Sequence, residues 1–215
     1  MSRARDAAHA RPTTVVLTGF GPFPGVPINA TVRLVPEIAM ALGKRRIDLS
    51  IITDILPVAW ERGPARVRAL IGEHRPDLVI HFGVSSAARG LVVERQAHNF
   101  CRTSADADGN LPSLNLIDAD LGEAAVLPVS LPLDCVAAAL DDMGIRFALS
   151  DDAGGYLCNA VLHASLREAA PDVAVGFLHV PADLGAADCP LAWEDAVEAG
   201  VAVVTACLTD GGARS

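Results

Sequence analysis

Cys158 and His179 are the residues whose types and spacing could do chemistry. Cys158 follows a pair of glycines and opens an apolar stretch with helical spacing, residues 156–169. The positive end of the helix dipole acts on a thiol at this position and favours the thiolate. His179 lies at the end of the next apolar run, residues 173–180. A thiolate for attack and an imidazole to protonate the leaving group are the minimum needed for nucleophilic catalysis.

A third group should orient the imidazole, and Glu94 is the best acid for this role. It ends the apolar alternation in LVVERQAHN, so we expect its carboxylate to face a cleft. A surface salt bridge between Glu94 and Arg95 is the plainer alternative. Asp151 and Asp152 are rivals for the same role, although either could instead cap the helix that contains Cys158.

The remaining cysteines and histidines have simpler interpretations. His163 is expected to be a partly buried packing residue or a surface residue, and His9 and His74 to be solvated. Free cysteine is among the most buried residue types, so we expect four of the cysteines to be buried and structural. These four are Cys101, Cys135, Cys189 and Cys207. The chain has no CxxC pair and no histidine pair with zinc-ligand spacing, so the sequence gives no positive evidence for a metal site.

Residues 15–31, VVLTGFGPFPGVPINAT, suggest phosphate binding at first sight. A β-branched run leads into a loop with Gly19, Gly21 and Gly25. A dinucleotide fingerprint would need a third glycine at the position of Pro24, and the prolines of this loop remove amide donors. Asp54, at the end of the next expected strand, could still bind a ribose. A nucleotide- or nucleoside-binding enzyme that uses the Gly19–Gly25 loop therefore remains an alternative.

The same loop holds two aromatic rings, Phe20 and Phe23, on a backbone stiffened by proline. These rings suit a small, flat, uncharged ligand better than a phosphate.

Strand-like and helix-like segments alternate along the chain. The expected strands are 13–18, 50–56, 77–82, 146–149 and 173–180, and the expected helices are 30–42, 59–74, 133–143, 156–169 and 191–208. Residues 89–131 are irregular, with short strand-like pieces. The alternation predicts a single-domain α/β fold, a three-layer α/β/α sandwich with a mostly parallel twisted sheet. A strand–helix–strand unit would then bring Cys158 and His179 to the same edge of the sheet.

Composition narrows the function classes. The chain has 215 residues, 51% hydrophobic and 4% aromatic, and a net charge of −9 that argues against a nucleic-acid partner. Residues 1–12 form a polar tail without the apolar core of a signal peptide, and we see no membrane span. We place the catalytic domain at 13–215. The odd number of cysteines fits the cytoplasm.

Five stretches, in order along nearly the whole chain, resemble the pyroglutamyl-peptidase I (pyrrolidone-carboxylate peptidase) family of cysteine peptidases. They are VLTGFGPF with NAT downstream, DLVIHFGVS, VVERQAHN, SDDAGGYLCN and GFLHVP. The resemblance implies a triad of Cys158, His179 and Glu94, with Phe20 and Phe23 around a pyroglutamate ring. It also implies a cytoplasmic, cofactor-free exopeptidase, often a homotetramer, that acts on small peptides with an N-terminal pyroglutamate.

Three positions test how far this resemblance holds. Asn29 opens N-A-T where the family usually has N-P-S, and it joins the expected substrate-binding residues. Arg102 is the candidate for an arginine near the oxyanion. Gly155 stands where many relatives have a larger residue. A non-catalytic pocket protein derived from the peptidase is a further alternative, although all three triad positions are filled.

Overall fold

The computed structural model describes residues 11–46 and 48–211, so most of the expected tail 1–12, including His9, lies outside the described residues. Within them the strands form a six-stranded sheet and a two-stranded sheet. In spatial order the larger sheet contains β2 (Leu49–Leu56), β1 (Thr13–Phe20), β3 (Leu78–Ser85), β8 (Ala174–Pro181), β4 (Leu91–Glu94) and β7 (Phe147–Ser150). The smaller sheet pairs β5 (Gln96–His98) with β6 (Val126–Pro128).

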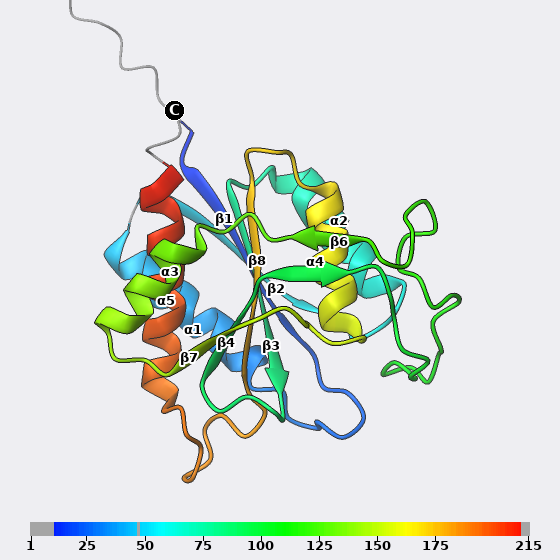
Figure 1. Cartoon of the computed structure of the whole chain (residues 1–215). Coiled ribbons are helices and arrows are strands. Elements are labelled where there is room, and N and C mark those ends of the chain that lie inside the picture. Colours follow the sequence, from blue (N-terminus) through cyan, green and yellow to red (C-terminus); the bar gives the residue numbers. More distant parts are fainter. Residues whose placement is uncertain (1–10, 47, 212–215) are drawn as a thin grey trace, which may run out of the picture.

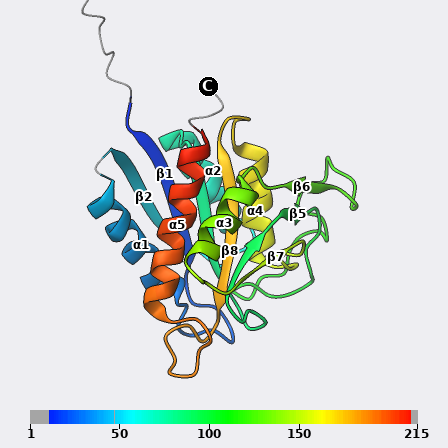
Figure 2. The same ribbon diagram turned by 60° about the vertical axis from the view of Figure 1, so that its left-hand side comes forward.

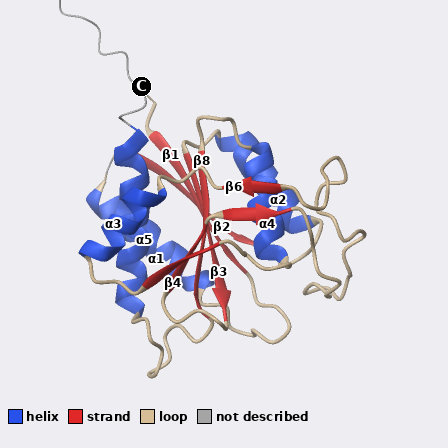
Figure 3. Ribbon diagram, viewed as in Figure 1, coloured by secondary structure: helices blue, strands red, loops and turns tan. Residues whose placement is uncertain are grey.

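Helices cover both faces of the larger sheet. One layer holds α1 (Thr31–Arg45), α3 (Leu133–Asp142) and α5 (Trp193–Gly211), and the other holds α2 (Arg62–His74) and α4 (Leu157–Glu168). Figures 1 and 3 show the two layers on opposite sides of the sheet. In Figure 2, α5 lies between α1 and α3. The expected α/β/α sandwich is confirmed.

The central strands are buried on both faces because successive side chains point to opposite layers. In β1, Val15 and Leu17 belong to the core under α1 and α5, whereas Val16 belongs to the core under α2 and α4. In β8 the same alternation sends Leu178 to the first core and Phe177 to the second. His179, two residues after Phe177, therefore faces the α2 and α4 side of the sheet.

The direction of two strands differs from the simplest expectation. β2, β1, β3 and β8 run parallel, but β4 runs antiparallel to β8, and β7 follows the direction of β4. Residues 86–90, which connect β3 to β4, are too few for the crossover that a parallel strand needs, so the chain turns back. The expected unit in which β7, α4 and β8 form a parallel strand–helix–strand motif is therefore wrong, although the sheet is mostly parallel as predicted.

None of the helices in the described part of the chain is long and apolar enough to cross a membrane.

Candidate active site

The structure brings His179 and Glu94 into direct contact. Nδ1 of His179 lies 2.8 Å from Oε1 of Glu94, and both side chains are buried. The antiparallel pairing of β4 with β8 creates this contact, because Val92 and Glu94 pair in register with His179 and Phe177. The second carboxylate oxygen of Glu94 is buried and has no hydrogen-bond partner among the described residues.

The surroundings of His179 favour its protonated form. Burial lowers the pKa of the imidazole, but the charge of Cys158 and a hydrogen bond with it act in the opposite direction. The hydrogen bond and charge of Glu94 add to that effect, and together these contacts raise the pKa of His179 to about 10. An imidazolium at this position is a counter-ion for a thiolate and a proton donor for a leaving group.

Cys158 is the second residue of α4, as its position after the glycine pair predicted. Its side chain is half-buried, and its sulfur lies close to the backbone of Gly83, where an added Cβ would be 3.1 Å from Sγ. Gly83 on β3 pairs in register with His179 on β8. The thiol therefore lies over β3, the strand next to the one that carries the imidazole. This position explains how the two groups meet although β7, which precedes α4, runs antiparallel to β8.

Two hollows meet at Cys158. An open groove of about 560 Å³ contains Cys158, His179 and Glu94 in its wall, together with Arg102 and Asp152. Small side chains at the end of β3 and just beyond β3 and β8, such as Ser85, Ala87 and Ala182, line much of the rest of the groove. A separate hollow of about 740 Å³ does not reach Cys158. It lies between α2 and residues 108–117, and none of the candidate catalytic residues is in its wall.

The second hollow at Cys158 is a narrow cavity whose wall is mostly apolar. Its lining residues are Phe20, Phe23, Asn29, Val58, Val84, Tyr156, Leu157 and Cys158. The three residues of the opening loop that the sequence marked for substrate binding are all in this list. Phe20 also packs on Phe177, with ring centroids 6.1 Å apart, and the Phe23 ring lies 6.0 Å from that of Tyr156.

Asn29 uses its amide to hold the opening loop together. Its Nδ2 donates to the carbonyl of Gly21 at 3.1 Å, and its Oδ1 accepts from the backbone N–H of Thr31 at 3.1 Å. The hydroxyl of Thr31 lies 2.9 Å from the backbone nitrogen of Phe20, which donates to it. Sequence reasoning marked Asn29 and missed Thr31. A threonine in the first turn of a helix is the signal that could have revealed it, because such hydroxyls bond to nearby backbone groups.

Arg102 lies in the groove wall and not in the narrow cavity. Its backbone N–H donates to the carbonyl of Gly155 at 2.8 Å, and its guanidinium pairs with no carboxylate in residues 11–46 and 48–211. A Cβ on Gly155 would lie 2.6 Å from Cγ of Arg102 and 2.8 Å from the Phe100 ring. The glycine that departs from the family pattern therefore leaves the space that the Arg102 side chain occupies.

The other candidate acids, Asp151, Asp152 and Asp54, form hydrogen bonds or ion pairs with groups other than His179. The carboxylate of Asp151 forms an ion pair with Arg95, so the expected alternative, a salt bridge between Arg95 and Glu94, does not occur. Oδ1 of Asp152 accepts from the N–H of Gly154 at 2.9 Å, inside the turn that precedes α4. Asp54, the candidate ribose-binding acid, accepts from Nε of Arg66 at 2.7 Å.

The other cysteines and histidines fit their expected roles in part. Cys101 and Cys207 are buried, but Cys189 is half-buried and Cys135 is exposed, so the expectation of a buried structural role is wrong for Cys135. Cys135 lies in the first turn of α3, one residue before Val136, which is buried. His163 is buried in α4, and burial lowers its pKa.

Asn159 and Phe177 are two further site residues that sequence reasoning missed. The side chain of Asn159 accepts from the N–H of His98 at 2.9 Å and donates to the carbonyls of His98 and Phe100 at 2.8 and 3.0 Å. A buried asparagine next to a candidate nucleophile was the available signal, because a buried amide must find partners. The Phe177 ring packs on that of His179 with centroids 4.7 Å apart, as the two-residue period of a strand would have predicted.

No group of three or more potential metal ligands occurs in the part of the chain that the structure describes.

Comparison with known proteins places the chain beside one family of peptidases. The model of the family described as "Pyroglutamyl peptidase" matches residues 13–192. The pyrrolidone-carboxylate peptidase of Thermococcus litoralis is 34% identical over 175 residues, which cover 78% of this chain and 76% of the relative. The enzyme of the same name from Oceanobacillus iheyensis is 31% identical over 172 residues, covering 78% and 83%.

Solved structures agree with this match. Pyrrolidone carboxyl peptidase from Pyrococcus furiosus superposes with a TM-score of 0.79 at 27% identity, covering 93% of this chain and 100% of that one. Pyroglutamyl peptidase I from Bacillus amyloliquefaciens superposes with a TM-score of 0.78 at 25% identity, covering 91% and 97%.

Proposed function

The chain belongs to the pyroglutamyl peptidase family, and from this premise we propose that it removes an N-terminal pyroglutamyl residue from peptides as a cysteine exopeptidase. Cys158 is the nucleophile, His179 the general acid and base, and Glu94 the group that orients the imidazole. The observation that carries the proposal is the buried His179–Glu94 pair, 2.8 Å apart, in the wall of the groove that holds Cys158.

The reaction begins with attack of the Cys158 thiolate on the carbonyl carbon that joins pyroglutamate to the next residue. A carbon–sulfur bond forms, and the carbonyl oxygen takes the negative charge. As the carbon–nitrogen bond breaks, the imidazolium of His179 gives its proton to the departing amine. The neutral imidazole then removes a proton from water, which attacks the thioester, releases pyroglutamate and returns the thiolate.

The developing oxyanion needs donors that are already in place. The N–H of Cys158 is a candidate because it lies in the first turn of α4, whose N-cap residue Tyr156 forms no side-chain cap. Arg102 is the second candidate donor. Its guanidinium has no carboxylate partner in the described residues and lies in the wall of the same groove as Cys158.

The narrow cavity, of only about 20 Å³, is too small for the ring alone, so the proposed site of the pyroglutamyl ring is this cavity together with the adjoining part of the groove, which shares Phe23, Tyr156 and Cys158 with it. Phe20 and Phe23 supply flat apolar contacts on a loop without a charged side chain, which suits an uncharged lactam. Asn29 supports this loop and contributes to the same wall. A site that hydrogen-bonds a lactam should reject proline, since proline would leave buried polar groups unpaired. The open groove beyond Cys158 is the space for the peptide that leaves.

A pyroglutamyl chromogenic amide tests the proposal directly. We expect the purified chain to release the chromophore, and prior treatment with a thiol alkylator to abolish the release. A purified, folded chain without any hydrolysis of this amide would contradict the proposed activity, and activity that survives complete alkylation of Cys158 would contradict the cysteine mechanism.

The same family resemblance leads us to propose a cytoplasmic homotetramer whose catalytic domain spans residues 13–215. Sedimentation velocity tests the tetramer and cell fractionation tests the location, both separately from the activity.

A further inference from the structure

Two segments far apart in the sequence carry the candidate acid and the candidate nucleophile, and they lie side by side. Glu94 ends β4 and pairs in register with Ser150, the last residue of β7. The next residue continues the contact, because the N–H of Arg95 donates to the carbonyl of Ser150 at 2.7 Å. Beyond this point the strand pairing stops, and the chain turns through residues 151–156 into the helix that contains Cys158.

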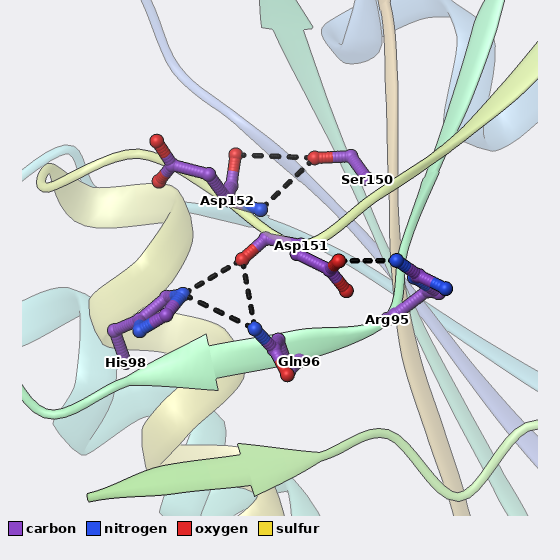
Figure 4. Close-up of polar contacts among 6 residues, drawn as sticks. All are labelled: Arg95, Gln96, His98, Ser150, Asp151 and Asp152. Atoms are coloured by element: carbon purple, nitrogen blue, oxygen red, sulfur yellow. Dashed lines mark hydrogen bonds and ion pairs between the residues drawn. The ribbon is translucent and has the colours of Figure 1, made fainter. Parts of the chain in front are cut away.

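A cluster of side chains from residues 95–98 continues the connection where the strands end (Figure 4). Nε2 of His98 lies 2.7 Å from the carbonyl oxygen of Asp151, and Nε2 of Gln96 donates to the same oxygen at 3.1 Å. A carbonyl can only accept, so the Nε2 atom of His98 carries a proton. The carboxylate of Asp151 forms the ion pair with Arg95. Three side chains from one segment thus converge on the first residue of the turn.

His98 is attached to both sides of Cys158. Its backbone N–H and carbonyl bond to the side chain of Asn159, the residue directly after the nucleophile. Its imidazole binds Asp151, at the start of the turn before the nucleophile. The other end of the turn is held by the N–H of Arg102 on the carbonyl of Gly155. Cys158 is therefore bracketed by contacts to the segment that begins at Glu94.

The contacts of Arg95, Gln96 and His98 with Asp151 contribute little to the stability of the fold. Asp151 and Arg95 are 54% and 45% exposed, and ion pairs at such exposure contribute little to stability. Water could satisfy the exposed carbonyl of Asp151 in place of Gln96 and His98. Water would not, however, keep the turn at one distance from Glu94. The side chains are thus better suited to setting position than to supplying stability.

We propose that Gln96 and His98 are positioning residues that hold the carbonyl of Asp151 and so fix Cys158 relative to Glu94 and His179. The proposal rests on the proposed peptidase function of this site. Reacting groups must be aligned to within a fraction of an ångström, and a small displacement costs rate more than affinity. Loss of the two donors should therefore lower kcat and leave KM nearly unchanged, because the ring cavity formed by Phe20 and Phe23 is untouched.

The test compares donor-deleting and donor-retaining variants. We expect His98→Leu combined with Gln96→Leu to lower kcat on a pyroglutamyl amide by about 10- to 100-fold. KM should change less than about threefold. His98→Gln keeps a donor near the position of Nε2 and should restore most of the rate. Ser130→Ala is the matched control, since the exposed Ser130 also donates to a carbonyl, that of Val173 near the start of β8, at the opposite end from His179.

Hydrogen–deuterium exchange of residues 151–159 supplies a readout that does not depend on activity. Exchange there should become faster in His98→Leu and in the double variant, return toward the wild-type rate in His98→Gln, and stay unchanged in Ser130→Ala. If the double variant does not fold, the single variants provide the same comparison.

Unchanged kcat together with unchanged exchange in a folded His98→Leu, Gln96→Leu protein would overturn the positioning proposal. A loss of rate that His98→Gln fails to restore while exchange stays at the wild-type level would also overturn it. If the wild-type chain itself hydrolyses no pyroglutamyl amide, the proposed function fails, and the exchange rates still decide whether Gln96 and His98 hold the turn.

Discussion

Nδ1 of His179 and Oε1 of Glu94 lie 2.8 Å apart between two buried side chains that are 85 residues apart in the chain. The pair depends on an antiparallel contact between β4 and β8 in a sheet that is otherwise mostly parallel. The carboxylate in this arrangement holds one ring orientation of the histidine and stabilises its imidazolium form. The site therefore has an oriented imidazole before any substrate binds.

Cys158→Ser tests the nucleophile. The change replaces one small half-buried group by another, so the melting temperature should stay within a few degrees of the wild type. A serine hydroxyl in this setting stays protonated, and we expect kcat to fall by about 10³-fold or more. Full activity in a folded Cys158→Ser protein would show that another residue attacks the substrate.

Glu94→Gln tests the group that orients the imidazole. The amide keeps the shape of the side chain but removes the charge that stabilises the imidazolium, so kcat should fall by about 10²- to 10⁴-fold. Asp151→Asn and Asp152→Asn are the comparison variants, because the structure engages these two carboxylates with Arg95 and Gly154. Both should retain most of the wild-type turnover. A greater loss of turnover in either aspartate variant, at a normal melting temperature, would assign the role of Glu94 to that aspartate.

The raised pKa of His179 predicts how stability depends on pH. The pKa is about 10 in the folded chain against the ordinary value of 6.5, so the folded state holds a proton that the unfolded state releases. This stabilisation is fully present below about pH 6.5 and is lost as the pH rises towards 10. Melting temperatures of the wild type and of His179→Gln, measured from pH 6 to pH 10, check the prediction. The advantage of the wild type should shrink across this range, and an advantage that grows with pH would contradict it.

Gly155→Ala tests the close contact between the turn and Arg102. The new Cβ would lie 2.6 Å from Cγ of Arg102 and 2.8 Å from the Phe100 ring, so residues 100–102 must shift. We expect a lower kcat and a destabilisation of about 1–3 kcal/mol. Gly72→Ala in α2 is the control, since nothing lies within 4 Å of its added Cβ, and it should stabilise the helix by about 0.5–1 kcal/mol. Wild-type kcat and stability in Gly155→Ala would show that the space is not needed.

Substrate specificity tests the proposed binding of a lactam in the narrow cavity. We expect cleavage after pyroglutamate and at least about 10²-fold lower kcat/KM after glutamate, glutamine or proline. The charged or open-chain residues do not suit a narrow apolar cavity lined by Phe20 and Phe23, and proline lacks the lactam carbonyl. Parallel assays on the four amides provide the measurement. Comparable rates on the prolyl amide would show that the cavity selects ring shape alone.

The sequence by itself determined most of the elements and the positions of several functional groups within them, but it left residues 89–131, which contain β4, β5 and β6, as an irregular region with short strand-like pieces. Local rules were sufficient here, because the two-residue period of strands and the helical spacing after a glycine pair depend only on near neighbours. They placed Cys158 in the first turn of a helix and His179 near the end of a buried strand, and both placements agree with the structure. The proline-stiffened loop with Phe20 and Phe23 was also evident from its residues, and both rings line the narrow cavity.

Only the tertiary structure decided which of these groups meet. The choice between Glu94 and the two aspartates depended on the reversal of β4, which comes from a short connection and from strand pairing between distant segments. The exposure of Cys135 and the hydrogen bonds between Asn159 and His98 likewise depend on how α3 and α4 pack against segments far away in the chain. Strand direction and side-chain partners are set by contacts between distant residues, and the local pattern of a sequence does not contain that information.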